Sequence, residues 1–182
     1  MSKLLWLLPL SVILYACPYE SNVPLEKTPV ELIDSSLIGY WYGIVKDGSD
    51  YFGIEALEIS RQSDSLYSVI RYGKTVKGDM ILPDTAYFTS YSSRIRDQHY
   101  MNVIGKAPDG GNQPVYYLAS FSLSQDTLHV RTITETFTAR KSFPRPEDLK
   151  KMVLDMSQNR NIFDDLYSLS YRKIPKPASF KP

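Results

Sequence analysis

The feature that most constrains the fold of this chain is a succession of short apolar or alternating segments, each followed by a turn. In the clearest of them, 115–123, every second residue is Val, Tyr, Ala, Phe or Leu. Ser124-Gln125-Asp126 and a second apolar segment at 127–133 follow, so this region predicts a β-hairpin. Further strands are expected at 51–59, 66–72, 85–91 and 98–104. Neighbouring strands joined by short turns predict an antiparallel meander, in a fold that is mainly β.

Glycines and prolines set the expected breaks between these strands. Gly73 is expected to end the strand at 66–72, while Gly78 and Pro83 predict an irregular stretch before the next strand. The stretch 105–114 is the richest in turn-forming residues and is interpreted as a mobile loop.

One amphipathic helix is expected after the strands. Pro146 suits the first helical position, and Glu147 and Asp148 suit the positive end of the helix dipole. Its apolar residues recur with helical spacing, at Leu149, Met152, Val153 and Met156. A single apolar stripe predicts a C-terminal helix packed on the outside of the sheet. A last strand at 166–174 and a disordered tail at 175–182, with three prolines, follow it.

The N-terminus has the layout of a secretory signal. Lys3 precedes an apolar run at 4–15, which Pro9 interrupts. This run is shorter than the roughly 20 residues that a membrane-spanning helix needs. Residues 1–16 are therefore predicted to be a signal peptide.

The end of that run, Leu14-Tyr15-Ala16-Cys17, resembles the bacterial lipobox. The resemblance implies cleavage between Ala16 and Cys17 and acyl chains, such as palmitate, on Cys17. Cys17 is the one cysteine of the chain, so an intrachain disulfide is excluded and lipid attachment accounts for it. An ordinary signal peptide with a chance cysteine, or an uncleaved anchor, are the alternatives. Residues 17–31, with three prolines, are interpreted as the lipidated cysteine and a flexible tether.

The charge of the chain and its expected location both fit a lipid anchor. Of 21 basic residues one, Lys3, lies in the signal peptide, which leaves 20 basic and 20 acidic residues. A balanced chain lacks the basic excess expected of a nucleic-acid-binding protein. The expected location is the bacterial cell envelope, with the lipid in the outer membrane. The folded domain would lie on either the periplasmic or the surface side of that membrane.

A second resemblance begins at residues 32–38, a short turn that Asp34 or Ser35 can cap. The following Gly39-Tyr40-Trp41-Tyr42 resembles the first signature of the lipocalins, a family of the calycin group. The resemblance implies that residues 32–174 form an up-and-down barrel of about eight or nine antiparallel strands. Gly39, Trp41 and Tyr42 would form the barrel motif, with Trp41 at the closed end. An arginine would lie over this tryptophan, either Arg131 or Arg140.

The sequence contains no recognisable catalytic constellation, so an enzyme is not predicted. His99 and His129 lack Cys, Asp or Glu at metal-ligand spacing, so neither a metal site nor a cofactor is expected. Glu55 and Glu58 fall on opposite faces of one strand and cannot flank a single bond. Many of the 14 tyrosines lie in expected strands, where they either line a cavity or stand on the outer face.

Two functional hypotheses follow. The first is a membrane-anchored lipoprotein that binds a small hydrophobic or amphipathic ligand in its barrel. The second is a non-enzymatic module that binds an envelope protein, with the barrel as a scaffold and the 105–114 loop as the candidate contact.

Overall fold

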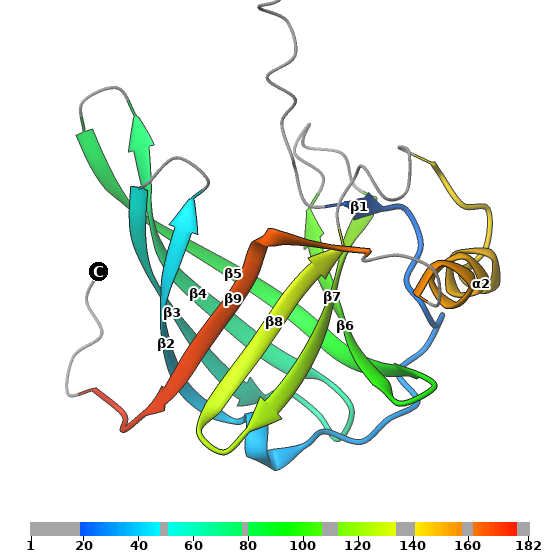
Figure 1. Cartoon of the computed structure of the whole chain (residues 1–182). Helices are drawn as coiled ribbons and strands as arrows, with labels where there is room; N and C mark the ends of the chain where they lie inside the picture. The colour runs from blue at the N-terminus through cyan, green and yellow to red at the C-terminus, as the bar shows by residue number, and fades with distance from the viewer. Residues whose placement is uncertain are drawn as a thin grey trace, which may run out of the picture.

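The protein folds as a closed β-barrel with a helix outside it (Figure 1). This computed structural model describes residues 19–47, 51–77, 80–106, 113–133, 141–157 and 162–177. The barrel strands are β2 (Gly39–Asp47), β3 (Tyr51–Arg61), β4 (Tyr67–Lys77), β5 (Met80–Ile95), β6 (Gln98–Lys106), β7 (Pro114–Ser124), β8 (Thr127–Ile133) and β9 (Phe163–Ile174). A short strand, β1 (Glu20–Ser21), and a 3-10 helix, η1 (Ser35–Leu37), precede them, and the α-helix α2 (Pro146–Ser157) lies between β8 and β9.

All strand pairs are antiparallel, and consecutive strands are neighbours from β2 to β9. The pairing of β9 with β2 closes the ring of eight, and β1 is one extra strand added to β7. The predicted fold class is confirmed, because an up-and-down arrangement follows directly from strands joined by short turns. The helix predicted from Pro146 onward is also confirmed, and it lies outside the barrel.

The two ends of the barrel differ. At one end, here called the Trp41 end, lie η1 and the hairpin turns that follow β3, β5 and β7. At the other, here called the splayed end, β8 ends and β9 begins. There β2 and β9 diverge, since they pair only from Tyr40 to Gly43, next to the Trp41 end (Figure 1).

A second layer covers the outer face of β5, β6 and β7. Leu149 and Val153 of α2 are fully buried against this face, as their helical spacing predicts. They meet Tyr100 and Leu118, which point outward from β6 and β7. This cluster, here called the outer core, also contains Tyr19, Leu25, Ile95, Ile133, Phe143 and Ile162.

Several strands are longer than the sequence predicts. β4 continues through Gly73 to Lys77, and β5 begins at Met80 and includes Pro83. The two strands pair without interruption, with Gly73 opposite Asp84 and Lys74 opposite Pro83. The expected break is therefore wrong, because one proline removes a single donor while pairing on both sides of it continues.

The flexible tether predicted at 17–31 also needs correction. Its described part begins at Tyr19, which is 2% exposed, and Ser21 and Leu25 are 1% exposed. Apolar side chains among the prolines are buried in the outer core, so residues 19–26 belong to the folded domain. Composition missed this because prolines are compatible with an extended segment that lies along a protein surface.

Some predictions concern residues outside the described ranges. These are the signal peptide with Ala16 and Cys17, the middle of the 105–114 loop, Arg140 and the tail beyond residue 177. The described ends of that loop, Gly105 with Lys106 and Pro114, belong to β6 and β7.

Candidate ligand-binding site

The interior of the barrel is filled at the Trp41 end. Trp41 is fully buried, and its indole N–H donates to the Leu37 carbonyl oxygen at 2.8 Å. Leu37 belongs to η1, which Asp34 caps by accepting from Ser36 N at 2.8 Å. The cluster formed by Leu37, Trp41, Ile59, Tyr67, Leu128 and Tyr171 is here called the inner plug. Trp41 therefore lies in a packed cluster that fills this end of the barrel.

Gly39 allows the chain to enter the first barrel strand. Its φ of 142° lies in a region that side-chain-bearing residues rarely adopt. A Cβ atom at this position would also lie 2.9 Å from Cε of Lys173. The motif glycine thus brings the start of β2 close to the Lys173 side chain.

Among the described residues, the cation over the tryptophan is Lys173 and not Arg131, while Arg140, the other expected candidate, lies outside the described ranges. Lys173 Nζ lies 5.1 Å from the centroid of the Trp41 ring and donates to the Ser36 carbonyl oxygen at 2.7 Å. Arg131 instead lies over Phe163, at 4.5 Å from the ring centroid. Lys173 comes from β9 because β9 pairs with β2 directly opposite Trp41, a register that the sequence does not reveal.

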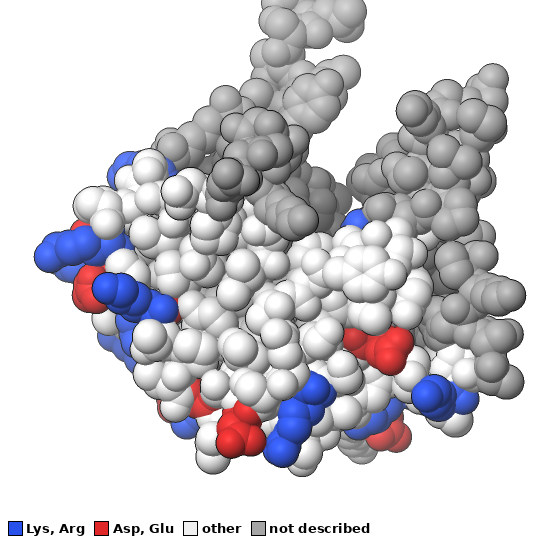
Figure 2. All heavy atoms as spheres, turned by 180° about the vertical axis from the view of Figure 1, so that it is seen from behind, with Lys and Arg blue, Asp and Glu red and all other residues white. Residues whose placement is uncertain are grey.

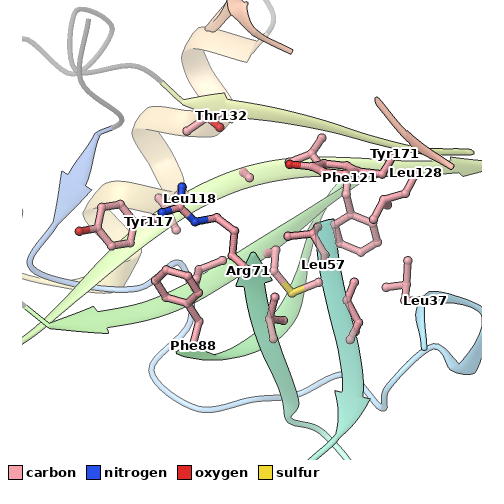
Figure 3. Close-up of a pocket in the computed structure, with 16 residues that line it drawn as sticks. Leu37, Leu57, Arg71, Phe88, Tyr117, Leu118, Phe121, Leu128, Thr132 and Tyr171 are labelled. Atoms are coloured by element: carbon pink, nitrogen blue, oxygen red, sulfur yellow. The ribbon is translucent and has the colours of Figure 1, made fainter. Parts of the chain in front are cut away.

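Beyond the inner plug the barrel encloses a cavity of about 420 Å³ (Figure 3). Its wall is formed mainly by aliphatic and aromatic side chains from β3 to β9. The described residues that line it are Leu37, Leu57, Ile59, Val69, Arg71, Phe88, Met101, Val103, Tyr117, Ala119, Phe121, Leu128, Val130, Thr132 and Tyr171, together with Leu118, although the Leu118 side chain is buried in the outer core. The alternation predicted for 115–123 points Tyr117, Ala119 and Phe121 into this space.

A cluster of three polar side chains, Glu55, Arg71 and Tyr171, interrupts the apolar wall of the cavity. The Tyr171 hydroxyl donates to Glu55 Oε1 at 2.6 Å, and Arg71 Nη1 lies 3.6 Å from Glu55 Oε2. Arg71 and Tyr171 line the cavity. The Glu55 side chain that they contact is mostly buried, at 13% exposed. Burial raises the pKa of the Tyr171 hydroxyl well above its usual value, and the Glu55 carboxylate raises it further. Sequence reasoning missed this group because its members come from three separate strands.

The acidic residues of β3 are on opposite faces, as predicted. Glu55 points inward, while Glu58 is on the outer face and accepts hydrogen bonds from the Tyr40 and Tyr72 hydroxyls at 3.0 and 3.1 Å. Of the tyrosines considered in the sequence, Tyr117 lines the cavity and Tyr67 belongs to the inner plug. Tyr42 and Tyr87 are exposed, at 39% and 74%.

The two histidines lie in β6 and β8, where strands were predicted. His99 Nε2 accepts from Arg94 Nη2 at 2.8 Å, and its ring lies 5.6 Å from that of Phe121. His129 Nδ1 lies 2.9 Å from the Ser170 hydroxyl and is exposed. Within the described ranges, no three His, Cys, Asp or Glu side chains are grouped so as to hold a metal ion.

Comparison with known proteins assigns the chain to no family. No family model, no curated protein and no solved structure matches the chain. Among the described residues, no helix is both long and apolar enough to span a bilayer.

Proposed function

We propose that this protein is an exported lipoprotein, anchored to the cell envelope through lipid on Cys17, whose barrel binds a small amphipathic molecule. The observation that carries the ligand-binding part is the apolar cavity of about 420 Å³ inside the barrel. Cavities that bind small molecules have volumes of about 300–1,000 Å³ and mostly apolar walls with few polar groups. The barrel of this protein has both properties.

The polar group in the wall favours an amphipathic ligand over a purely apolar one. Arg71 is the one charged side chain among the described lining residues, and 36% of it is exposed. A guanidinium carries N–H donors in a planar fork, a geometry that suits carboxylate and other oxygen acceptors. A ligand with its apolar part toward the inner plug and a hydrogen-bond acceptor near Arg71 fits this arrangement.

The anchor part of the proposal rests on the sequence. The lipobox-like Leu14-Tyr15-Ala16-Cys17 follows an apolar signal region, and Cys17 is the chain's one cysteine. Two or more acyl chains hold a protein stably on a bilayer without any apolar patch on its folded domain. The balanced charge of the mature chain means that the lipid, rather than a basic surface, would supply the membrane affinity.

The ligand-binding part is tested by filling the cavity. Val103→Phe places a larger side chain in the cavity, and Ile104→Phe, on the opposite face of β6, is the matched control. Titration with a fluorescent fatty-acid analogue should give a Kd about tenfold higher for Val103→Phe, equivalent to about 1.4 kcal/mol, and little change for the control. Equal affinities for both variants, or no binding by the unmodified protein, would contradict the proposal.

The anchor is tested separately. Mass spectrometry of the protein from cell envelopes should show a mature chain that begins at Cys17 and carries acyl groups. Cys17→Ser should abolish this lipid mass and release the protein from the membrane fraction. A substituted protein that stays in the membrane fraction would show that the anchor assignment is wrong.

A second candidate function is recognition of an envelope protein through the outer wall of β2 to β5. Tyr40, Glu58, Ile70 and Tyr87 are directly opposite one another across these four strands, and Tyr42 and Tyr72 are in the adjacent row. Figure 2 shows a broad area with few charges on the outer face of the barrel. Tyrosine is enriched in the centres of protein interfaces. Cross-linking in cells that captures a partner with the unmodified protein, but not with Tyr87→Lys, would support it.

A further inference from the structure

The segment that leads from Cys17 into the domain is fixed to the barrel almost at once. Tyr19 is buried, its backbone N–H donates to the Ile133 carbonyl oxygen at 3.0 Å, and its hydroxyl donates to the Lys141 carbonyl oxygen at 3.0 Å. Glu20 and Ser21 then pair with Tyr117 and Tyr116 of β7. The chain is therefore attached two residues after the predicted lipid site.

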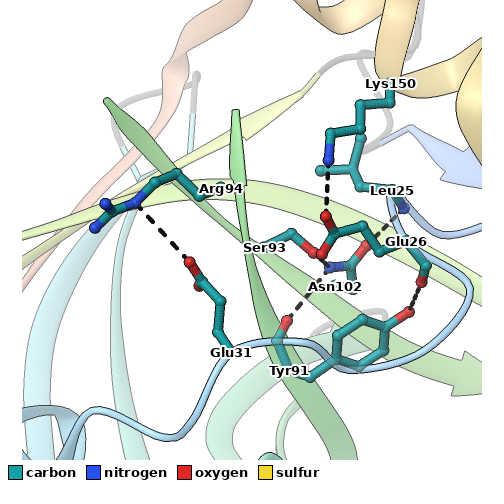
Figure 4. Close-up of polar contacts among 8 residues, drawn as sticks. All are labelled: Leu25, Glu26, Glu31, Tyr91, Ser93, Arg94, Asn102 and Lys150. Atoms are coloured by element: carbon teal, nitrogen blue, oxygen red, sulfur yellow. Dashed lines mark hydrogen bonds and ion pairs between the residues drawn. The ribbon is translucent and has the colours of Figure 1, made fainter. Parts of the chain in front are cut away.

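Further contacts hold the next residues in place (Figure 4). Asn22 bonds both backbone groups of Phe143, at 2.7 and 3.1 Å. The backbone N–H of Leu25 donates to Oδ1 of the fully buried Asn102 at 2.8 Å. Glu26 pairs with Lys150 of α2 at 2.7 Å and accepts from the Tyr91 hydroxyl through its carbonyl oxygen at 2.6 Å. Buried and charge-assisted hydrogen bonds of this kind hold the segment in one position, whereas a flexible tether exposed to solvent would lack them.

The place of attachment is the splayed end. Ile133, the partner of Tyr19, is the last residue of β8, which begins at Thr127 at the Trp41 end. The seven residues of β8 extend for about 20 Å at about 3.3 Å each. Two residues of chain, in contrast, reach about 7 Å at most.

From this geometry we infer that the splayed end of the barrel faces the membrane that holds the lipid on Cys17, so that the cavity receives its ligand from the bilayer. This inference rests on the proposed anchor at Cys17. An attachment point within about 7 Å of Tyr19 cannot bring the Trp41 end to the lipid surface while the splayed end points away from it. Residues 19–26 cannot act as a free spacer between the lipid and the domain, because they are bound to the domain.

The anchor segment also touches the cavity wall. The Tyr117 side chain lines the cavity, while its hydroxyl donates to Glu20 Oε1 of β1 at 3.1 Å. At the opposite end, the inner plug closes the barrel around Trp41. An amphipathic molecule that leaves the bilayer at the splayed end would thus enter the cavity without crossing bulk water, where its apolar part is poorly solvated.

The experiment uses the native lipidated protein, purified from envelopes and reconstituted in phosphatidylcholine vesicles that contain bromine-labelled acyl chains, which quench tryptophan fluorescence. Removal of the signal peptide also removes Trp6, so Trp41 is then the one native tryptophan. Gln113→Trp adds a reporter beside β7 at the splayed end, and Ser63→Trp adds a matched reporter in the turn at the Trp41 end. Both native positions are exposed.

We expect strong quenching of the added tryptophan in Gln113→Trp, and little quenching in Ser63→Trp or the unmodified protein. A Gly-Ser spacer of about 20 residues before Tyr19, with an average span of roughly 25 Å, should remove most of that difference. Equal quenching of the two reporters, stronger quenching of Ser63→Trp, or no effect of the spacer would overturn the inference even if the ligand still binds. Absence of lipid on Cys17 would overturn the anchor and this inference together, and mass spectrometry distinguishes that outcome.

Discussion

The two faces of β6 and β7 are packed differently, although their residues alternate along the same strands. On the outer face, Tyr100 and Leu118 are 1% and 0% exposed, because α2 and Leu25 cover them. On the inner face, Val103 and Ala119 line a cavity. Protein interiors are normally packed as densely as organic crystals, so the outer face is the ordinary case and the inner face is the exception.

This difference assigns separate roles to the two faces. The inner plug and the outer core contain the fully buried large side chains, and so they provide most of the apolar stabilisation. Residues along the cavity lose favourable contacts on one side, which lowers stability unless a ligand supplies them. We therefore expect substitutions in the two cores to reduce stability, and substitutions along the cavity wall to change ligand affinity.

The largest effect is expected at the inner plug. Trp41→Ala removes a fully buried ring, its hydrogen bond to Leu37 and its contact with Lys173, and should lower the free energy of unfolding by about 3–5 kcal/mol. Tyr87→Ala, at a side chain that is 74% exposed, should change it by less than about 0.5 kcal/mol. Urea denaturation measures both. Comparable losses in the two variants would mean that the inner plug does not carry the stability assigned to it.

A smaller effect is expected where the anchor segment joins the outer core. Asn102→Ala leaves the buried N–H of Leu25 without its acceptor and removes the bonds from Asn102 to Ser93 and Tyr91. An unsatisfied buried group of this kind costs about 1–3 kcal/mol. Hydrogen exchange should accelerate most in residues 19–26, whereas Gln98→Ala, at an exposed side chain, should leave exchange there unchanged. Uniform acceleration across the whole barrel would contradict a local role for Asn102.

The sequence predicted the barrel and the helix because both follow from local periodicity. Alternation placed Tyr117, Ala119 and Phe121 on the inner face, and helical spacing placed Leu149 and Val153 on the buried side of α2. These patterns depend only on the geometry of a strand or a helix, so they can be recognised without knowing which elements are neighbours.

The candidate site was less predictable because it depends on register between distant strands. Lys173 lies over Trp41, and Tyr171 bonds Glu55, only because β9 pairs with β2 in one particular alignment. The docking of Tyr19 and Leu25 was missed for a related reason. A proline-rich segment has no period that distinguishes a free tether from one bound along a surface.

The smallest effect is expected where the inner plug meets the cavity, at Tyr171. Burial and the Glu55 carboxylate raise the pKa of its hydroxyl well above the ordinary value of 10.0, so the folded state holds this proton more tightly than the unfolded chain does. That contribution to stability is complete below about pH 10 and is lost as pH rises above it toward the raised pKa. Tyr171→Phe should cost about 1 kcal/mol at neutral pH, through the lost hydrogen bond, and should weaken the alkaline loss of stability.

Other tyrosines limit the size of this change. Burial also raises the pKa of Tyr67 and of Tyr100, so Tyr171→Phe should remove only part of the decline above about pH 10. Urea denaturation at several pH values up to about pH 11 measures the decline, with Tyr87→Phe as an exposed control. If Tyr171→Phe and the control gave the same pH dependence, the burial of Tyr171 beside Glu55 would make no contribution to the alkaline loss of stability.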